Sequence, residues 1–237
     1  MDKTMKHLLI YINPSKDFDK DYNSRTLVEF QIDNSLEFCN KEDLLFVTNF
    51  PYEYHGVNAF VVEEDLFCIN DKKASKVNTI IYLLENNMLG DLTWFHDLDA
   101  FQLHPIDVEL DKEIGFTSYG WNENWNTGSI FFKPSSLDIF KWIREGVYSY
   151  RKGLEERALK ILTDSNFNNI NSRYQKMNIT YNLGMREIEY LVSIADKPIK
   201  VVHFPPNWPG LMEKFKPILT ERFTKLVYEK FTDLPKP

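Results

Sequence analysis

The stretch TWFHDLDAFQ, which runs from Thr93 to Gln102, decides how the chain is interpreted. Its first half is an aromatic-rich apolar run, which predicts a short buried strand. Its second half predicts a turn that carries two carboxylates, Asp97 and Asp99. Like charges this close are costly unless something neutralises them. A divalent cation such as Mg²⁺ or Mn²⁺, which prefers carboxylate oxygens, would do so.

Two interpretations of this turn stay open. In the first, Asp97 and Asp99 cap backbone N–H groups of an Asx-type turn in water. In the second, both carboxylates hold one ion and leave coordination sites for a substrate phosphate. The surrounding sequence favours metal binding, because the turn directly ends an aromatic-rich strand and the most clearly amphipathic helix of the chain precedes that strand.

Composition narrows the possible classes of protein. The 237 residues are 43% hydrophobic and 15% aromatic, which supports a packed core and argues against disorder. A net charge of −7 gives no long-range attraction to nucleic acid or to an anionic membrane. The apolar run near the N-terminus is too short for a signal peptide or a transmembrane segment, so we expect a cytoplasmic protein. Cys39 and Cys68 are predicted to be buried free thiols.

Strand-like and helix-like runs alternate through the first two-thirds of the chain. Apolar runs predict strands at residues 8–12, 43–50, 58–63, 92–96, 114–119, 128–133 and 200–204. Helical spacing predicts helices over residues 24–38, 74–89, 135–150 and 154–164, with Gly90 as the left-handed cap of the second. This alternation predicts an α/β fold with a mostly parallel central sheet flanked by helices. Ligands bind such sheets beyond the carboxyl ends of the strands, and the acidic turn follows such an end.

The last part of the chain is helical in pattern. Pro217 interrupts the pattern and is predicted either to break the helix into two segments or to kink it. The sequence therefore predicts an α/β domain of residues 1–210 and a C-terminal helical extension of residues 211–237 packed on it.

Four segments, taken in order, resemble the GT-A-fold glycosyltransferases, which hold a metal-bound nucleotide-diphospho-sugar with a DxD motif. The segments are FHDLDAF at 95–101, WNTGSIFFKPS at 125–135, GLEERAL at 153–159 and IKVVHFPPNWPG at 199–210. The resemblance covers most of residues 8–210, and glycogenin-like members and compact viral or phage enzymes are the most similar. The loop after the late histidine departs from the family pattern, because it contains no lysine for the diphosphate.

The resemblance implies a metal site and a donor site. Asp97, Asp99 and His203 would bind Mn²⁺ or Mg²⁺, although an ordinary core histidine is the alternative for His203. In the segment WNTG, Asn126 would bind the donor sugar and Gly128 would leave room for it. The alternative for both is a simple turn that enters a strand.

The same resemblance implies where the nucleotide and the catalytic group lie. Members of the family seat the base and ribose near the first strand, which points to Tyr11, Asn13 and Arg25. Lys76 could contact a phosphate, although a solvated lysine is the commoner case, and Asp97 would reach the donor through the ion. Glu155 and Glu156 stand where an inverting transferase has its catalytic base. Acids are favoured at a helix start in any case, so a purely structural role stays open.

Aromatic residues near these segments have two interpretations as well. Trp121, Asn122 and Trp125 in GWNENWN could bind the faces of a sugar ring, or they could pack a loop onto the core. His96 precedes the DxD on a strand and would face away from Asp97. We therefore interpret it as a residue that packs in the core or supports the metal ligands without contacting the ion.

The leading hypothesis is a metal-dependent hexosyltransferase. It would move a sugar from a nucleotide-diphosphate-sugar, with a UDP-sugar favoured, to a glycan or another hydroxyl acceptor. A nucleotidyltransferase that forms the nucleotide-sugar is the first alternative, but YINPSKDFDKDY, residues 11–22, lacks the glycine-rich loop typical of that class. A non-catalytic carbohydrate- or nucleotide-binding domain is the second.

Overall fold

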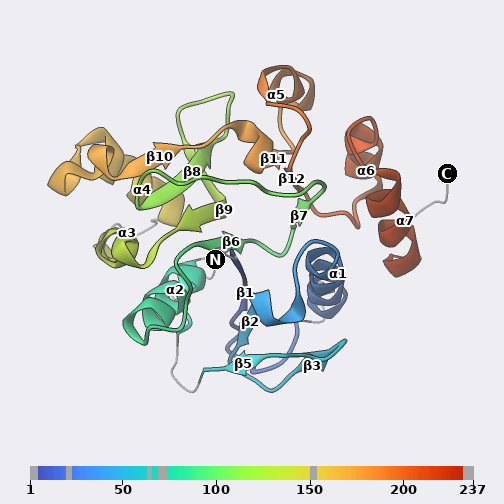
Figure 1. Ribbon diagram of the computed structural model, residues 1–237, viewed down its shortest axis with the longest axis horizontal. Helices are drawn as coiled ribbons and strands as arrows, with labels where there is room; N and C mark the ends of the chain where they lie inside the picture. Colours follow the sequence, from blue (N-terminus) through green and yellow to red (C-terminus); the bar gives the residue numbers. More distant parts are fainter. Residues whose placement is uncertain (1–4, 20–22, 63–65, 69–73, 150–153, 232–237) are drawn as a thin grey trace.

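A mixed seven-stranded sheet forms the centre of the computed structural model, which describes residues 5–19, 23–62, 66–68, 74–149 and 154–231. The strand order is β10-β8-β9-β6-β1-β2-β5 (Figure 1). The strands are β1 (Lys6–Tyr11), β2 (Leu44–Thr48), β5 (Phe60–Val61), β6 (Thr93–His96), β8 (Ile114–Ser118), β9 (Trp125–Phe132) and β10 (Tyr174–Lys176). In this sheet β9 runs antiparallel to β6 and β8, and the other neighbours are parallel, which confirms the predicted mostly parallel sheet.

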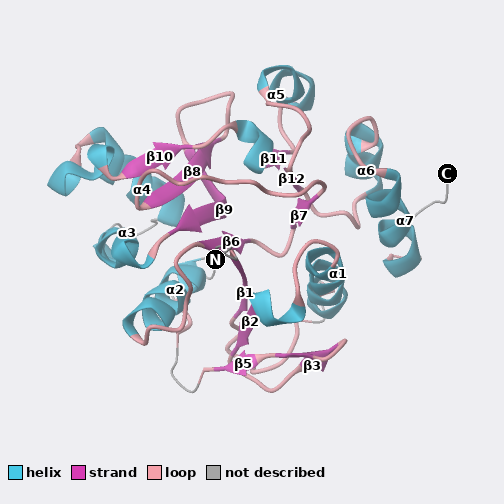
Figure 2. Ribbon diagram, viewed as in Figure 1, coloured by secondary structure: helices cyan, strands magenta, loops and turns pink. Residues whose placement is uncertain are grey.

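Helices cover both faces of this sheet, as the ribbon coloured by secondary structure shows (Figure 2). They include α1 (Ser24–Leu36), α2 (Ser75–Glu85), α3 (Leu137–Ser149) and α4 (Glu155–Asp164). Neighbouring residues of a strand point to opposite faces, and β1 shows the result. Leu8 belongs to the buried cluster that includes residues of α2, α3 and α4, whereas Leu9 belongs to the cluster that includes Val28 and Ile32 of α1.

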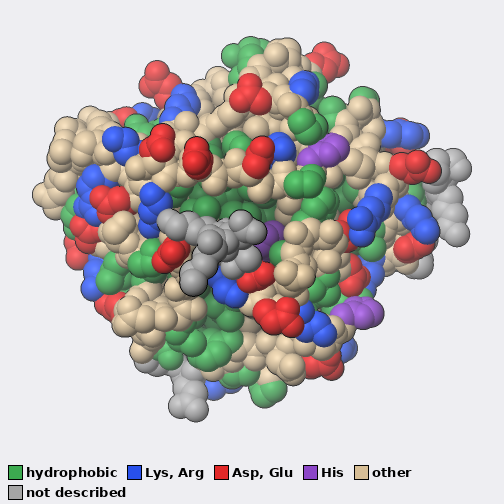
Figure 3. Space-filling model, viewed as in Figure 1, with side chains coloured by type: hydrophobic (Ala, Val, Ile, Leu, Met, Phe, Trp, Pro, Cys, Tyr) green, Lys and Arg blue, Asp and Glu red, His purple; other side chains and the backbone are tan. Residues whose placement is uncertain are grey.

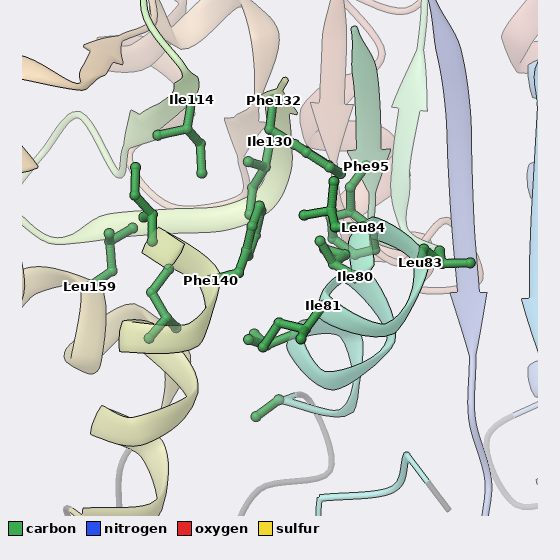
Figure 4. Packing of buried hydrophobic residues seen from close by; sticks show 14 of the residues in the cluster. Ile80, Ile81, Leu83, Leu84, Phe95, Ile114, Ile130, Phe132, Phe140 and Leu159 are labelled. Atoms are coloured by element: carbon green, nitrogen blue, oxygen red, sulfur yellow. The ribbon is translucent and has the colours of Figure 1, made fainter. Parts of the chain in front are cut away.

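The helix α2 packs on the sheet through the apolar face that its sequence predicts. Ile80, Ile81 and Leu84 are buried in the same cluster as Phe95 and Phe132 of the sheet (Figure 4). Fully burying one such side chain stabilises a fold by about 1.5–3 kcal/mol. The predicted cap of this helix is wrong, because the residue with a left-handed backbone is Asn87, at φ 55°, and not Gly90.

A second, three-stranded sheet has the order β11-β12-β7. Its strands are β11 (Leu183–Gly184), β12 (Val201–His203) and β7 (Ala100–Gln102). The antiparallel register of β12 and β7 pairs His203 with Ala100, the residue that follows Asp99. A histidine far along the sequence thereby comes next to the acidic turn.

Two helices end the described chain, α6 (Pro209–Phe215) and α7 (Glu221–Lys230). Pro217 lies between them, as predicted. The side chains of Phe223 and Val227 in α7 are buried in one cluster with Phe30 and Phe101. The helices thus pack on the α/β core, while the division of the chain at residue 210 stays a prediction and residues 232–237 lie outside the described residues.

The remaining elements are short. A two-stranded sheet of β3 (Glu53–Tyr54) and β4 (Val57–Asn58) flanks the centre, and α5 (Ile188–Ile194) follows β11. Glu63 and Tyr150, the predicted ends of two elements, lie outside the described residues.

Both cysteines are free, as predicted, and Cys68 is buried, whereas Cys39 is only half-buried. Acidic and basic side chains are interspersed on the face that Figure 3 shows. Among the described helices, we find none whose length and apolar content would suffice to cross a bilayer.

Candidate active site

A cavity of about 840 Å³ lies at the carboxyl ends of β1, β6 and β8. Its lining includes nine of the eleven residues that the sequence predicts for the site, namely Tyr11, Asn13, Lys76, Asp97, Asp99, Asn126, Glu155, Glu156 and His203. The other two, Arg25 and Gly128, are not part of the lining. The position agrees with the general rule that open α/β sheets bind ligands at this edge.

The acidic turn and the late histidine meet in this cavity. One ligand atom from each of Asp97, Asp99 and His203 lies within 4.8 Å of the others. The turn is held in place from both sides. The Asp97 N–H donates to the Gly128 carbonyl at 2.8 Å, and the Ala100 N–H donates to the Asp97 carbonyl at 3.0 Å.

The charges of these three side chains act on one another. Burial raises the pKa of Asp97, although Lys76 and His203 act in the opposite direction. Burial raises the pKa of Asp99, but the charge and the hydrogen bond of His203, whose Nε2 lies 3.1 Å from Asp99 Oδ1, together lower it. The pKa of Asp99 is therefore below its ordinary value. Burial lowers the pKa of His203, but the charge and the hydrogen bond of Asp99 together raise the pKa of the imidazole above its ordinary value. The two carboxylates therefore need positive charge between them, and a divalent cation supplies it most directly.

The orientation of His203 is fixed by Asn182, a residue for which the sequence gives no signal. The Asn182 side-chain nitrogen donates to the Asn126 carbonyl at 3.3 Å, which turns its Oδ1 toward the imidazole. His203 Nδ1 lies 3.0 Å from that Oδ1 and donates to it. In the neutral ring the lone pair is then on Nε2, the nitrogen that faces Asp99. Metal-binding histidines are held in this way, so the donor set fits a divalent cation.

Gly128 makes room for a protein side chain at this point. A Cβ atom on Gly128 would overlap Cε1 and Nδ1 of His203. The sequence predicted that this open space serves the donor sugar, but the imidazole of His203 fills it. A side chain at position 128 would therefore displace the third member of the acidic cluster.

Lys76 connects the acidic turn to α4. Its Nζ donates to Asp97 Oδ1 and to the Thr127 carbonyl, each at 3.1 Å, and lies 3.1 Å from Glu155 Oε1. Burial lowers the pKa of this lysine, but Asp97 and Glu155 together raise it above its ordinary value. An ammonium group has three protons, and protein groups take up all three. The lysine is thus a buried bridge and not a solvated side chain.

Glu155 and Glu156 differ in their surroundings. Burial raises the pKa of Glu155, but Lys76 more than compensates and lowers it. The pKa of Glu156 is raised by burial, against a hydrogen bond from Tyr119. The Tyr119 hydroxyl donates to Glu156 Oε1 at 2.9 Å, and the Thr127 N–H donates to the same oxygen at 3.3 Å. Of the two, Glu156 is therefore the stronger base.

The end of β1 also lines the cavity. The Tyr11 hydroxyl accepts a hydrogen bond from the Asp19 N–H at 2.9 Å, and the Asn13 N–H donates to Asn49 Oδ1 at 3.1 Å. Arg25 lies elsewhere. Its side chain is 67% exposed, and its Nε lies 3.3 Å from Glu29 Oε1.

The residues of the segment GWNENWN support both interpretations, sugar binding for some and core packing for others. Trp121 and Asn122 line the cavity. Trp125 is buried, and its indole N–H donates to Thr163 Oγ1 at 2.9 Å. His96 is also buried, where it stacks on Trp94 with 4.0 Å between the ring centroids, and it does not line the cavity. Trp125 and His96 are therefore packing residues.

Neither the protein-family models nor the curated proteins contain a match to the sequence. Solved structures do match. A galactosyltransferase, LgtC, in complex with donor and acceptor sugar analogs superposes with a TM-score of 0.58 over 98% of each chain, at 15% identity. A glycosyltransferase involved in glycosylation of the major capsid of PBCV-1 gives 0.56 over 90% of this chain and 98% of that one, at 14% identity.

The glycosyltransferase GlyE of Streptococcus pneumoniae TIGR4 gives a TM-score of 0.59 at 12% identity, and the match spans 98% of this chain and 66% of that one. Identities this low carry information about the fold alone. The protein therefore has the GT-A fold of these glycosyltransferases, as the sequence motifs predicted.

Proposed function

We propose that the protein is a metal-dependent glycosyltransferase. It would transfer a sugar from a nucleotide-diphosphate-sugar, with a UDP-sugar favoured, to a hydroxyl acceptor. The observation that carries the proposal is the meeting of Asp97, Asp99 and His203 in a large cavity of a GT-A fold.

Asp97, Asp99 and His203 would hold Mn²⁺ or Mg²⁺. When bound, the ion supplies positive charge where negative charge develops on the leaving diphosphate. The protein keeps the three ligands in position without it. Asn182 orients the imidazole, and Lys76 holds Asp97 against the strand β9 through the Thr127 carbonyl.

The cavity also offers places for the two parts of the donor. Tyr11 and Asn13 at the end of β1 suit the nucleoside, and Asn126 at the start of β9 suits the sugar. Glu155 adds a second sugar contact, because its Oε2 is buried and makes no hydrogen bond within the described residues. A sugar hydroxyl that donates to this oxygen would satisfy it.

Glu156 is the better candidate for the group that takes the proton of the acceptor hydroxyl. General bases work best when their pKa lies near the operating pH, and the pKa of Glu156 is raised whereas that of Glu155 is lowered. Glu155 is neutralised by Lys76 and is better suited to holding the sugar.

The test is metal-dependent hydrolysis across a panel of nucleotide-sugars, with water as the acceptor. We expect Asp97→Asn and Asp99→Asn to reduce hydrolysis at least a hundredfold and to weaken Mn²⁺ binding in calorimetry. Asp107→Asn removes a carboxylate whose side chain is 80% exposed, and it should behave like the wild type. Full activity in both site variants would refute the metal assignment, and nucleotide binding without turnover of any donor would favour a binding domain.

A further inference from the structure

Trp121 and Arg186 form a charged aromatic pair on the cavity wall next to α5. The Arg186 guanidinium lies 5.6 Å from the centroid of the Trp121 ring, and both residues line the cavity. The loop that carries Trp121 is well supported. The Tyr119 N–H donates to the Asn124 carbonyl at 2.9 Å, and Gly120, at φ +78°, lies against Leu191 of α5.

The charge of Arg186 contrasts with the rest of the lining. The described lining contains five carboxylates, those of Asp19, Asp97, Asp99, Glu155 and Glu156. Its other cationic side chain of fixed charge, Lys76, is occupied by Asp97 and Glu155. Within the described residues, Arg186 makes no ion pair, and its charge faces an otherwise acidic cavity.

The strand order locates this pair relative to the proposed donor. Along the edge of the sheet, β1, β6, β9 and β8 are successive neighbours. They bring Tyr11, Asp97, Asn126 and the loop of Trp121 to the cavity in that order. Three strand spacings of about 4.8 Å separate β1 from β8, roughly 14 Å in all. With the nucleoside at β1, the diphosphate at Asp97 and the sugar at Asn126, the next position belongs to the acceptor.

We propose that Trp121 and Arg186 form an acceptor subsite that selects an acceptor carrying a phosphate or a carboxylate group close to the reacting hydroxyl. This inference rests on the proposed function. An exposed indole face packs on the apolar face of a sugar, and a guanidinium binds phosphate or carboxylate through two parallel hydrogen bonds. Arg186 is exposed, so water solvates its guanidinium until an anionic group of the acceptor takes the place of that water.

Binding of paired monosaccharides to the metal-free protein tests the subsite. The pairs are glucose and glucuronate, galactose and galacturonate, and mannose and mannose 6-phosphate, measured by calorimetry or ligand-observed NMR. We expect at least one anionic member to bind tenfold or more tightly than its neutral partner. Arg186→Gln should abolish that preference, and Trp121→Leu should weaken both members of the pair.

The matched control is Arg157→Gln, which removes an exposed arginine of α4 that does not line the cavity and should keep the preference. The proposal is overturned if no anionic sugar is preferred by the wild type, or if the preference survives in Arg186→Gln. A loss of affinity for UDP with Mn²⁺ in Arg186→Gln would assign the arginine to the donor and overturn the acceptor assignment. None of these measurements needs turnover, so failure of donor hydrolysis would refute the proposed function separately.

Discussion

Gly128 is the residue that allows His203 to reach the acidic turn, because a Cβ there would overlap the imidazole. We expect Gly128→Ala to push the ring away from Asp97 and Asp99 and to weaken Mn²⁺ binding at least tenfold. Overpacking in a buried strand should also cost about 1–3 kcal/mol of stability. Calorimetric titration and urea unfolding measure the two effects. The control is Gly210→Ala, where the added methyl group meets nothing within 4 Å; wild-type affinity in Gly128→Ala would contradict the argument.

His7 gives the protein a stability that depends on pH. Burial lowers the pKa of this side chain to about 4, from an ordinary value of 6.5. Between these two values the unfolded chain binds a proton that the folded chain does not, so stability decreases as the pH falls. A shift of this size corresponds to a loss of about 3 kcal/mol between pH 7 and pH 4.

Urea unfolding at pH 7 and pH 4 measures this contribution when the wild type is compared with His7→Gln. The variant lacks the titrating group, and its stability should fall by about 3 kcal/mol less over the same interval. The difference between the two proteins isolates His7 from the other groups that titrate. Equal pH dependence in both would show that His7 is not held in its neutral form.

At the residue scale, the sequence could predict the ligands but not the residues that orient them. Asp97 and Asp99 flank Leu98 in one acidic turn, and His203 ends a recognisable apolar strand. Asn182 acts on His203 only because β11 and β12 pair, and the sequence does not display that pairing. Arg186 and Trp121 likewise meet through the packing of α5 against the loop after β8.

At the scale of elements, the strands and the helix that the sequence did not predict are all short. The helix α2 and the strands β1 and β6 have enough apolar residues at one period to be predicted from the sequence. β7, β11 and α5 have three, two and seven residues, too few to display a period. They exist because long-range contacts stabilise them. The acidic turn is therefore flanked by one strand that the sequence predicts and one that it does not.

The helix α7 belongs to the folded core and is not a loose appendage. Phe223 is 1% exposed and packs against Phe30 and Phe101, with ring centroids 5.5 Å apart in both cases. We expect Phe223→Ala to lower the free energy of unfolding by about 3–5 kcal/mol. The control is Lys225→Ala, whose side chain is 75% exposed and which should change stability by less than about 0.5 kcal/mol. A loss below 1 kcal/mol in Phe223→Ala, measured by urea unfolding, would show that α7 is dispensable.

At the scale of the whole molecule, the site draws its parts from two of the three sheets and from the helices and loops around them. β1 and β6 provide one wall, β12 adds the histidine, and α4 adds the two glutamates. The arrangement concentrates negative charge in a protein that is already acidic, and this charge opposes folding until cations balance it. A ligand that brings positive charge to the cavity should therefore stabilise the entire fold.

Thermal unfolding can detect this coupling. A ligand that binds only the folded state, present at a hundred times its Kd, adds about 2.7 kcal/mol to the free energy of unfolding. For a chain of this size the Tm should rise by roughly 5–10 °C. We expect Mn²⁺ and UDP together to give this rise, and EDTA to reverse it. Asp99→Asn should remove most of the rise, because its carboxylate lies 3.1 Å from His203 at the centre of the proposed ion site. An equal rise in wild type and Asp99→Asn would place the stabilising ion elsewhere on the protein.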